Sequence, residues 1–248
     1  MQDVNQEKIV GIIGGMGPEA TVDLMSRVIR LTPALDDADH IRCIVDNNPK
    51  VPSRIKALID GAGESPVPEL QDMARCLEAW GADFLAMPCN TSHYYFQDIQ
   101  GAVSIPMLNL IEITVQEVLR QQPGIDKVGI LGSTALILTG LYQQAFAASG
   151  VRVVYPETAC QDRVMVLIKD IKKGAMDLAF PVFESSVSSL ETQGAQALVI
   201  ACTELSLLPD ASLSSAHQPL PRYDSSDILA RDIIRTCKVK NLKSIGPP

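Results

Sequence analysis

Aromatic side chains are scarce in this chain of 248 residues: Phe, Tyr and Trp together make up 4% of it, with a single Trp. The hydrophobic residues, 46% of the chain, are therefore mostly aliphatic and suffice for a sizeable core. No apolar run approaches the roughly 18 residues of a membrane-spanning helix. The N-terminal residues also lack a basic segment followed by an apolar one, so we expect no signal peptide.

Positive charge is also in short supply. The chain has 21 basic and 29 acidic side chains, which give a formal net charge of -8. This balance argues against nucleic acid or an anionic membrane as a partner. It leaves room for a small anionic ligand, because such a site needs only a few local donors.

The cysteines form no C-x-x-C pair, which argues against a zinc site or a thioredoxin-type site. Without a secretory signal we expect reduced thiols and a cytoplasmic location. The six cysteines are Cys43, Cys76, Cys89, Cys160, Cys202 and Cys237.

Two of these cysteines end apolar runs. Residues 84–87 lead to Cys89-Asn90-Thr91, and residues 197–201 lead to Cys202-Thr203-Glu204. Each run is typical of a buried strand that ends at the thiol and turns into a helix, whose N–H groups favour a thiolate. The other four cysteines lack this context, and we interpret them as packing residues. His93 follows Cys89 by one helical turn and either tunes the thiol or is an ordinary helix residue.

The two halves of the chain share this plan. The run 128–133 repeats the apolar, Gly-rich run 9–14, and a cysteine motif follows each at a similar distance. Alternating strands and helices predict an α/β fold of two pseudo-symmetric units with mostly parallel sheets. Since ligands bind at the carboxyl edges of such sheets, we expect the active site in the cleft between the units. The first domain is predicted at 1–108 plus 213–248, carrying Cys89, and the second at 109–212, carrying Cys202.

The periodicity of apolar residues and the turn residues predict the individual elements. Strands are expected at 9–14, 41–46, 84–87, 105–108, 128–133, 197–201 and 220–223. Helices are expected at 18–31, 55–60, 68–80, 92–99, 111–121, 138–148, 163–174, 176–193 and 226–237. Residues 61–68 are expected to be flexible, and the tail 238–248 to fray.

A rival interpretation comes from Gly15-x-Gly17-x-x-Ala20, which matches a loose dinucleotide fingerprint after a strand. It would make the protein an oxidoreductase with a nicotinamide cofactor. Pro18 removes an N–H donor from the phosphate cradle, and only the cluster Asp36, Asp37, Asp39 could supply the acidic residue. The pattern therefore argues weakly for this function.

Three motifs together resemble the cofactor-independent aspartate/glutamate racemase superfamily. They are Gly14-Gly15-Met16-Gly17-Pro18, Met87-Pro88-Cys89-Asn90-Thr91 and Ala201-Cys202-Thr203-Glu204. The resemblance runs from about Ile9 to Ile233. Glutamate racemases of the cell-wall type usually carry His after the second Cys-Thr, where this chain has Glu204. The sequence is therefore most similar to the aspartate racemase branch.

This resemblance implies two pseudo-symmetric α/β domains, a homodimer, a small acidic amino acid as substrate, and neither pyridoxal phosphate nor a metal. It implies that Cys89 and Cys202 are the acid/base pair: one thiolate removes the Cα proton and the opposite thiol returns one. The expected function is the racemisation of aspartate, with glutamate as a second candidate.

The resemblance also implies the substrate-binding residues. They are Met16, Asn48, Arg54, Asn90, Thr91, Lys172, Thr203 and Glu204. Asn90 and the two threonines are expected to donate to the substrate, and a guanidinium suits a carboxylate.

Some of these residues also have ordinary explanations. Arg54 could be a solvated loop charge, Lys172 could belong to an exposed helix face with its neighbouring lysines, and Glu204 could interact with a helix N-terminus. One departure concerns Ser53, where close aspartate racemases carry Asp. It leaves the chemistry plausible and the substrate open.

Two alternatives stay open beside racemisation. A decarboxylase or isomerase of a small dicarboxylate would need one catalytic cysteine, and the presence of both argues against a decarboxylase. A protein that binds an acidic amino acid without turnover would keep the cleft, and Ser53 is the hint for that function.

Overall fold

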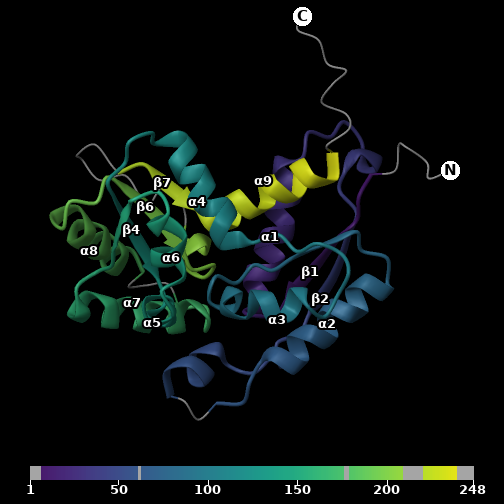
Figure 1. The fold of residues 1–248 in the computed structure, drawn as a ribbon, viewed down its shortest axis with the longest axis horizontal. Coiled ribbons are helices and arrows are strands. Elements are labelled where there is room, and N and C mark those ends of the chain that lie inside the picture. Colours follow the sequence, from purple (N-terminus) through teal and green to yellow (C-terminus); the bar gives the residue numbers. More distant parts are fainter. Residues whose placement is uncertain (1–6, 61–62, 176–178, 209–219, 239–248) are drawn as a thin grey trace, which may run out of the picture.

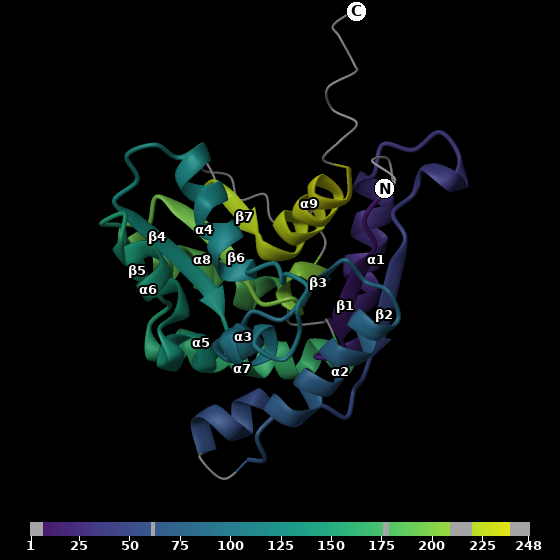
Figure 2. The same ribbon diagram turned by 45° about the vertical axis from the view of Figure 1, so that its right-hand side comes forward.

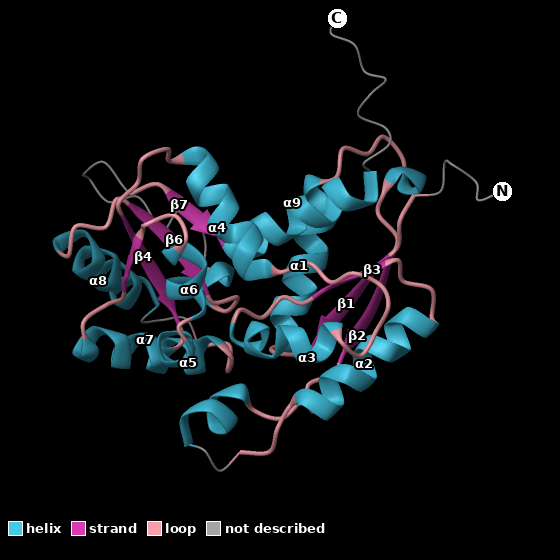
Figure 3. Ribbon diagram, in the orientation of Figure 1, coloured by secondary structure: helices cyan, strands magenta, loops and turns pink. Residues whose placement is uncertain are grey.

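The computed structural model describes residues 7–60, 63–175, 179–208 and 220–238. Part of the stretch predicted to be flexible and almost all of the tail predicted to fray lie outside these residues. Two parallel sheets, each with helices packed around it, form the two halves of the molecule (Figures 1 and 3). The predicted fold class, α/β with parallel sheets, is confirmed. Among the described residues, no helix combines the length and the apolar character needed to cross a bilayer.

The first sheet has the strand order β2-β1-β3, with β1 at Val10–Gly14, β2 at Cys43–Asn47 and β3 at Phe84–Ala86. β1 is buried along its whole length because it pairs with a parallel strand on each side. A continuous apolar run is the sequence pattern of such a central strand. The strand predicted at 105–108 is only an isolated bridge, in which Met107 pairs with Leu85 at the edge of β3.

The second sheet repeats this arrangement in the order β5-β4-β6-β7. Its strands are β4 at Lys127–Gly132, β5 at Arg152–Val154, β6 at Ala197–Ala201 and β7 at Arg222–Asp224. The central strands β4 and β6 correspond to β1 and β3, and β7 corresponds to the Met107 bridge. The duplication seen in the sequence is thus a duplication of sheet topology.

The helices carry the expected end signals. The first, α1, spans Pro18–Leu31 as predicted, with Pro18 at its start and Glu19 in its first turn. The others are α2 at Val67–Ala79, α3 at Phe96–Gln100, α4 at Leu110–Gln121, α5 at Thr134–Thr139, α6 at Leu141–Ala147, α7 at Thr158–Ile171, α8 at Ala179–Thr192 and α9 at Ser225–Lys238.

Three predicted helices differ from the structure. The helix predicted at 138–148 is two helices, α5 and α6, because Gly140 between them has φ +64 and ends the first with a left-handed turn. The helix predicted at 92–99 begins as a 3₁₀ turn at Thr91–Tyr95 before α3. The helix predicted at 55–60 is a π-helical turn at Lys56–Asp60. The short strand β5 was not predicted.

The C-terminal strand also differs from its predicted place. We expected residues 220–223 to return to the first domain, but β7 pairs with β6 in the second sheet. The following helix, α9, does pack against α1 of the first unit, and also against α4 (Figure 2). The chain therefore crosses between the units at the junction of β7 and α9.

The last helix of each unit covers the sheet of the other unit. Helix α4 follows the Met107 bridge of the first sheet, yet Val115 and Val118 pack with Val128 of β4. Helix α9 follows β7 of the second sheet, yet its Ile233 packs with Ile12 of β1. Each hydrophobic core is completed by a helix whose preceding strand lies in the other sheet.

A buried arginine reinforces this crossing point. The guanidinium of Arg27, on α1, pairs with Asp23 at 2.6 Å, with Asp224 of β7 at 3.0 Å and with Asp227 of α9 at 2.6 Å. It also donates to the carbonyl oxygen of Ser206 at 2.6 Å. Burial raises the pKa of Asp224, and the Arg27 charge opposes that shift. Arg27 thus ties the first unit to the end of the second sheet.

Replacing Arg27 should lower the free energy of unfolding. In Arg27→Met the buried carboxylate of Asp224 loses its cation, so we expect the free energy of unfolding to fall by about 3–5 kcal/mol. Urea denaturation followed by circular dichroism measures this loss. The matched control is Arg120→Met, whose ion pair with Glu117 is exposed, so its loss should leave the unfolding midpoint almost unchanged. Equal midpoints for the two variants would contradict the role given to Arg27.

Candidate active site

Both motif cysteines lie just beyond the carboxyl ends of parallel strands. Cys89 follows β3, and Cys202 follows β6 directly. The two residues line one cavity of about 60 Å³, to which both halves of the molecule contribute residues. This volume is far below the ~300–1,000 Å³ of drug-sized ligand sites. The cavity therefore suits a ligand much smaller than a drug-sized molecule.

Almost all of the residues predicted from the sequence meet at this cavity. Those that line it are Met16, Arg54, Cys89, Asn90, Thr91, Lys172, Cys202, Thr203 and Glu204. Ser53, the position at which the sequence departs from the resemblance described above, lines it too. The elements that supply them are far apart in the sequence, and the parallel topology of the two sheets brings them to one place.

Asn48 does not line the cavity. Its amide nitrogen donates to Glu69 Oε1 at 2.5 Å, and its side-chain oxygen accepts from the backbone N–H of Lys50. The backbone of Asn48 packs against Gly15, where an added Cβ would lie 2.1 Å from the Asn48 carbonyl oxygen. Asn48 thus supports the glycine turn from behind, and Gly15, at φ +91, is a position that favours glycine.

A serine hydroxyl contacts the sulfur of Cys89. The Ser92 Oγ lies 3.1 Å from Cys89 Sγ and 3.2 Å from Met16 Sδ, and Ser92 is fully buried. Ser92 is three residues after Cys89, so the 3₁₀ turn at Thr91–Tyr95 places its side chain beside the thiol. A buried hydroxyl in this place can donate to a thiolate.

His93 holds the Cys89 turn without reaching its sulfur. The Nδ1 of His93 lies 2.8 Å from the carbonyl oxygen of Cys89, and Nε2 accepts from the backbone N–H of Leu110 at 3.0 Å. Because Nε2 is an acceptor, the neutral ring carries its hydrogen on Nδ1. Burial lowers the pKa of His93 from its ordinary value of 6.5 to about 4.

The sulfur of Cys202 has a carboxylate as its neighbour. Cys202 Sγ lies 3.1 Å from Glu204 Oε2, and the other oxygen of Glu204 pairs with Lys172 Nζ at 3.3 Å. Burial, followed by the charge of Glu204, raises the pKa of the Cys202 thiol well above its ordinary value. Cys202 is therefore held in the protonated form, as a donor to Glu204.

The residues after Cys89 connect the units. Asn90 donates to Ser225 Oγ at 3.0 Å and accepts from the Tyr142 hydroxyl at 2.7 Å. Thr91 Oγ1 lies 3.0 Å from Ser133 Oγ. One amide hydrogen of Asn90 has no acceptor among the described residues, so it is left for a ligand.

Arg54 supplies positive charge to the cavity. Its guanidinium donates to the carbonyl oxygens of Pro52 at 3.0 Å and Met16 at 3.4 Å. Within the described part of the chain it forms no ion pair, so its charge is not neutralised by a carboxylate. Lys172, by contrast, is already paired with Glu204.

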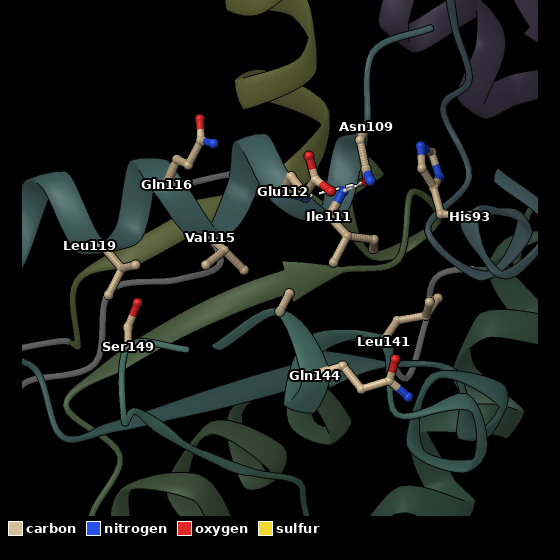
Figure 4. A pocket seen from close by; sticks show the side chains of 11 residues that line it. His93, Asn109, Ile111, Glu112, Val115, Gln116, Leu119, Leu141, Gln144 and Ser149 are labelled. Atoms are coloured by element: carbon tan, nitrogen blue, oxygen red, sulfur yellow. Dashed lines mark hydrogen bonds between the residues drawn. The ribbon is translucent and has the colours of Figure 1, made fainter. Parts of the chain in front are cut away.

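A larger cavity of about 480 Å³ lies between α4 and α6, behind the Cys89 turn (Figure 4). His93 stands at one end of it, and Glu112 is the charged residue among those that line it. No cysteine, lysine or arginine is among the described residues that line it. The chemistry predicted from the sequence therefore belongs to the smaller cavity.

Three contributing residues escaped the sequence interpretation. Ser92 stands inside the first cysteine motif, and its spacing of three residues from Cys89 was the signal that could have revealed it. Ser133 occupies, in the second glycine turn, the place of Gly15 in the first, so the repeat itself pointed to it. Tyr142 gave no such signal, because only the tertiary fold brings it to Asn90.

The chain is similar to several known proteins. Residues 13–233 match a protein family described as Asp/Glu/hydantoin racemase. A broad specificity amino-acid racemase, RacX, from Bacillus subtilis is 30% identical over 242 residues, which cover 92% of this chain and 97% of that protein.

Solved structures of amino-acid racemases also superpose on this chain. The aspartate racemase of Picrophilus torridus superposes with a TM-score of 0.81 at 31% identity, over 93% of this chain and 94% of that one. A glutamate racemase from Bacillus anthracis superposes with a TM-score of 0.66 at 19% identity, over 95% of this chain and 83% of that one. At that identity the second likeness concerns the fold alone.

Because His93 is buried, the free energy of unfolding should depend on pH. The pKa of His93 is about 4 in the folded protein, below the ordinary 6.5, so the unfolded chain binds more protons between these values. Stability is thus full above pH 6.5 and falls as the pH drops toward 4, by roughly 3 kcal/mol in all. Urea denaturation at a series of pH values measures this slope. His93→Asn keeps a donor for the Cys89 carbonyl and should remove that part of the slope; an unchanged slope would contradict the assignment.

Proposed function

Since the chain belongs to the Asp/Glu/hydantoin racemase family, we propose that it racemises aspartate with Cys89 and Cys202 as its acid/base pair. The observation that carries this proposal is that both cysteines, from two different sheets, line one small cavity. The proposed reaction uses the two thiols alone and involves no cofactor.

Two thiols suit the reaction because racemisation inverts one carbon. A base must remove the Cα proton from one face, and an acid must deliver a proton to the other face. Exchanging the roles of two identical groups serves both directions. Acid/base catalysis of this kind contributes about 10²–10⁴-fold. The rest must come from hydrogen-bond donors that stabilise the carbanion, for which Thr91, Thr203 and Asn90 stand next to the thiols.

The charges of the cavity favour an acidic substrate. The guanidinium of Arg54, which has no ion pair among the described residues, and the ammonium of Lys172 can receive two carboxylates. Glu204 can accept from the substrate ammonium. The small volume suits the short side chain of aspartate better than that of glutamate.

A second candidate is a racemase of broader specificity. It is favoured by the likeness to RacX, which is named a broad specificity amino-acid racemase, and by Ser53, which lines the cavity without adding a carboxylate. A panel of D- and L-amino acids separates the two candidates. The homodimer implied by the family resemblance and the cytoplasmic location expected from the lack of a secretory signal stay predictions.

The two-thiol mechanism predicts distinct effects for the two cysteines. In Cys89→Ser and in Cys202→Ser, full racemisation of aspartate should fall at least about 100-fold, because one face loses its acid/base. Each variant should still exchange the Cα proton of the one enantiomer that faces the remaining thiol. Proton NMR in deuterated water measures exchange, and optical rotation measures racemisation.

The matched control is Cys160→Ser, since Cys160 is buried but outside the cavity, and it should racemise at the normal rate. No Cα exchange by the unmodified protein with any acidic amino acid would refute the proposed function. Normal racemisation by either cavity variant would refute the mechanism.

Arg54 should act mainly in substrate binding. Arg54→Lys keeps a charge but loses the planar fork that meets a carboxylate with two hydrogen bonds. We expect KM for aspartate to rise about 10- to 100-fold, as for the loss of one charge-assisted bond, with a smaller change in kcat. Steady-state kinetics measures both. If kcat falls while KM stays constant, Arg54 does not bind the substrate carboxylate.

A further inference from the structure

The two thiols have unlike surroundings at equivalent positions. Three residues after Cys89 comes Ser92, whose hydroxyl contacts that sulfur. Three residues after Cys202 comes Leu205, which is buried and has no polar side-chain atom. Two residues after Cys202 comes Glu204, which accepts from the second thiol. One sulfur thus meets a donor, and the other meets an anion.

The hydroxyl of Ser92 lies between two sulfur atoms and has a single hydrogen. It can donate to Cys89 Sγ at 3.1 Å or to Met16 Sδ at 3.2 Å. A thioether is a weak acceptor, whereas hydrogen bonds to a charged acceptor are about twice as strong as neutral ones. When Cys89 is a thiolate, the hydrogen therefore points to Cys89.

The same hydroxyl also serves the protonated thiol. When Cys89 carries a proton, its S–H can donate to Ser92 Oγ, and the hydrogen of Ser92 then turns to Met16 Sδ. The change needs a rotation about one C–O bond and no movement of heavy atoms. Ser92 is fully buried, so water does not compete for its hydrogen.

We propose that Ser92 is a positioning residue that holds Cys89 as the resting thiolate by turning its hydroxyl from Met16 to Cys89, while Glu204 keeps Cys202 protonated. The inference rests on the proposed racemase function and adds the resting state of the pair. In the first half-reaction the Cys89 thiolate takes the Cα proton, and the hydroxyl of Ser92 turns back to Met16. Cys202 then gives its proton to the opposite face and becomes the thiolate.

The other charged and titratable groups at the cavity do not reverse this order. Arg54 and Lys172 line it together with both thiols, so their positive charge favours either thiolate. Lys172 pairs with Glu204 and only partly offsets that carboxylate beside Cys202. His93, behind Cys89, is neutral near pH 7, because its pKa is about 4.

Alkylation tests the resting state without any turnover. The full-length protein is treated with iodoacetamide over a series of pH values, and mass spectrometry follows the peptides that contain Cys89 and Cys202. Cys89 should react first near neutral pH. In Ser92→Ala, its alkylation near neutral pH should slow about tenfold, and the pH of half-maximal rate should rise by about one unit.

Two further variants make the result specific. Ser92→Thr keeps the hydroxyl and should retain the alkylation profile of the unmodified protein. Ser186→Ala removes another fully buried hydroxyl, 3.3 Å from the sulfur of Cys160, and should leave the alkylation of Cys89 unchanged. Circular dichroism shows which variants fold, and Ser92→Thr provides the comparison if Ser92→Ala does not.

Prior alkylation of Cys202, or a Ser92→Ala profile equal to that of the unmodified protein, would overturn the inference. The outcome is separable from the proposed function. If Cys89 is not alkylated before Cys202 but the protein still exchanges the Cα proton of aspartate, only the role of Ser92 is refuted. Absence of exchange with Cys89 still alkylated first refutes the racemase function and leaves the thiolate assignment standing.

Discussion

Everything proposed for this protein depends on two parallel sheets presenting their carboxyl edges to the same small space. A parallel strand ends with its side chains and helix N-termini at one edge, and each unit places a cysteine there. One such edge would offer a single acid or base. Two edges that share a cavity offer groups that reach a small ligand from different sides.

The polar contacts around the cavity hold this arrangement in place. His93 fixes the carbonyl of Cys89, and Ser206 contacts the carbonyl of Cys202 at the equivalent position. Asn90 joins the first motif to Ser225 of the last helix. Because buried hydrogen bonds are costly to leave unmade, these contacts keep the two turns in register with one another. The carbonyl oxygens of the two cysteines are therefore held in the same way, whereas their sulfur atoms have different partners.

The fold class, the duplication and most of the cavity could be predicted from the sequence, because each depends on local patterns. The apolar run before Cys89 and the proline at the start of α1 are signals of this kind. The split of α5 from α6 depended on the left-handed turn at Gly140. The presence of a single glycine in the sequence does not predict that its φ is positive. The pairing of β7 with β6 and the contact of Tyr142 with Asn90 are long-range and leave no local trace. The residues assigned from motifs alone divide in the same way: most line the cavity, and Asn48 supports it from behind.

The exchange of α4 and α9 bears on the origin of the molecule. A single ancestral half would have left its sheet uncovered on one face, with its last helix reaching outward. Such a half could complete its core only by swapping that helix with an identical copy. Fusion of the two copies would then have joined an already intertwined pair, and it would have freed the two cysteine turns to diverge from one another.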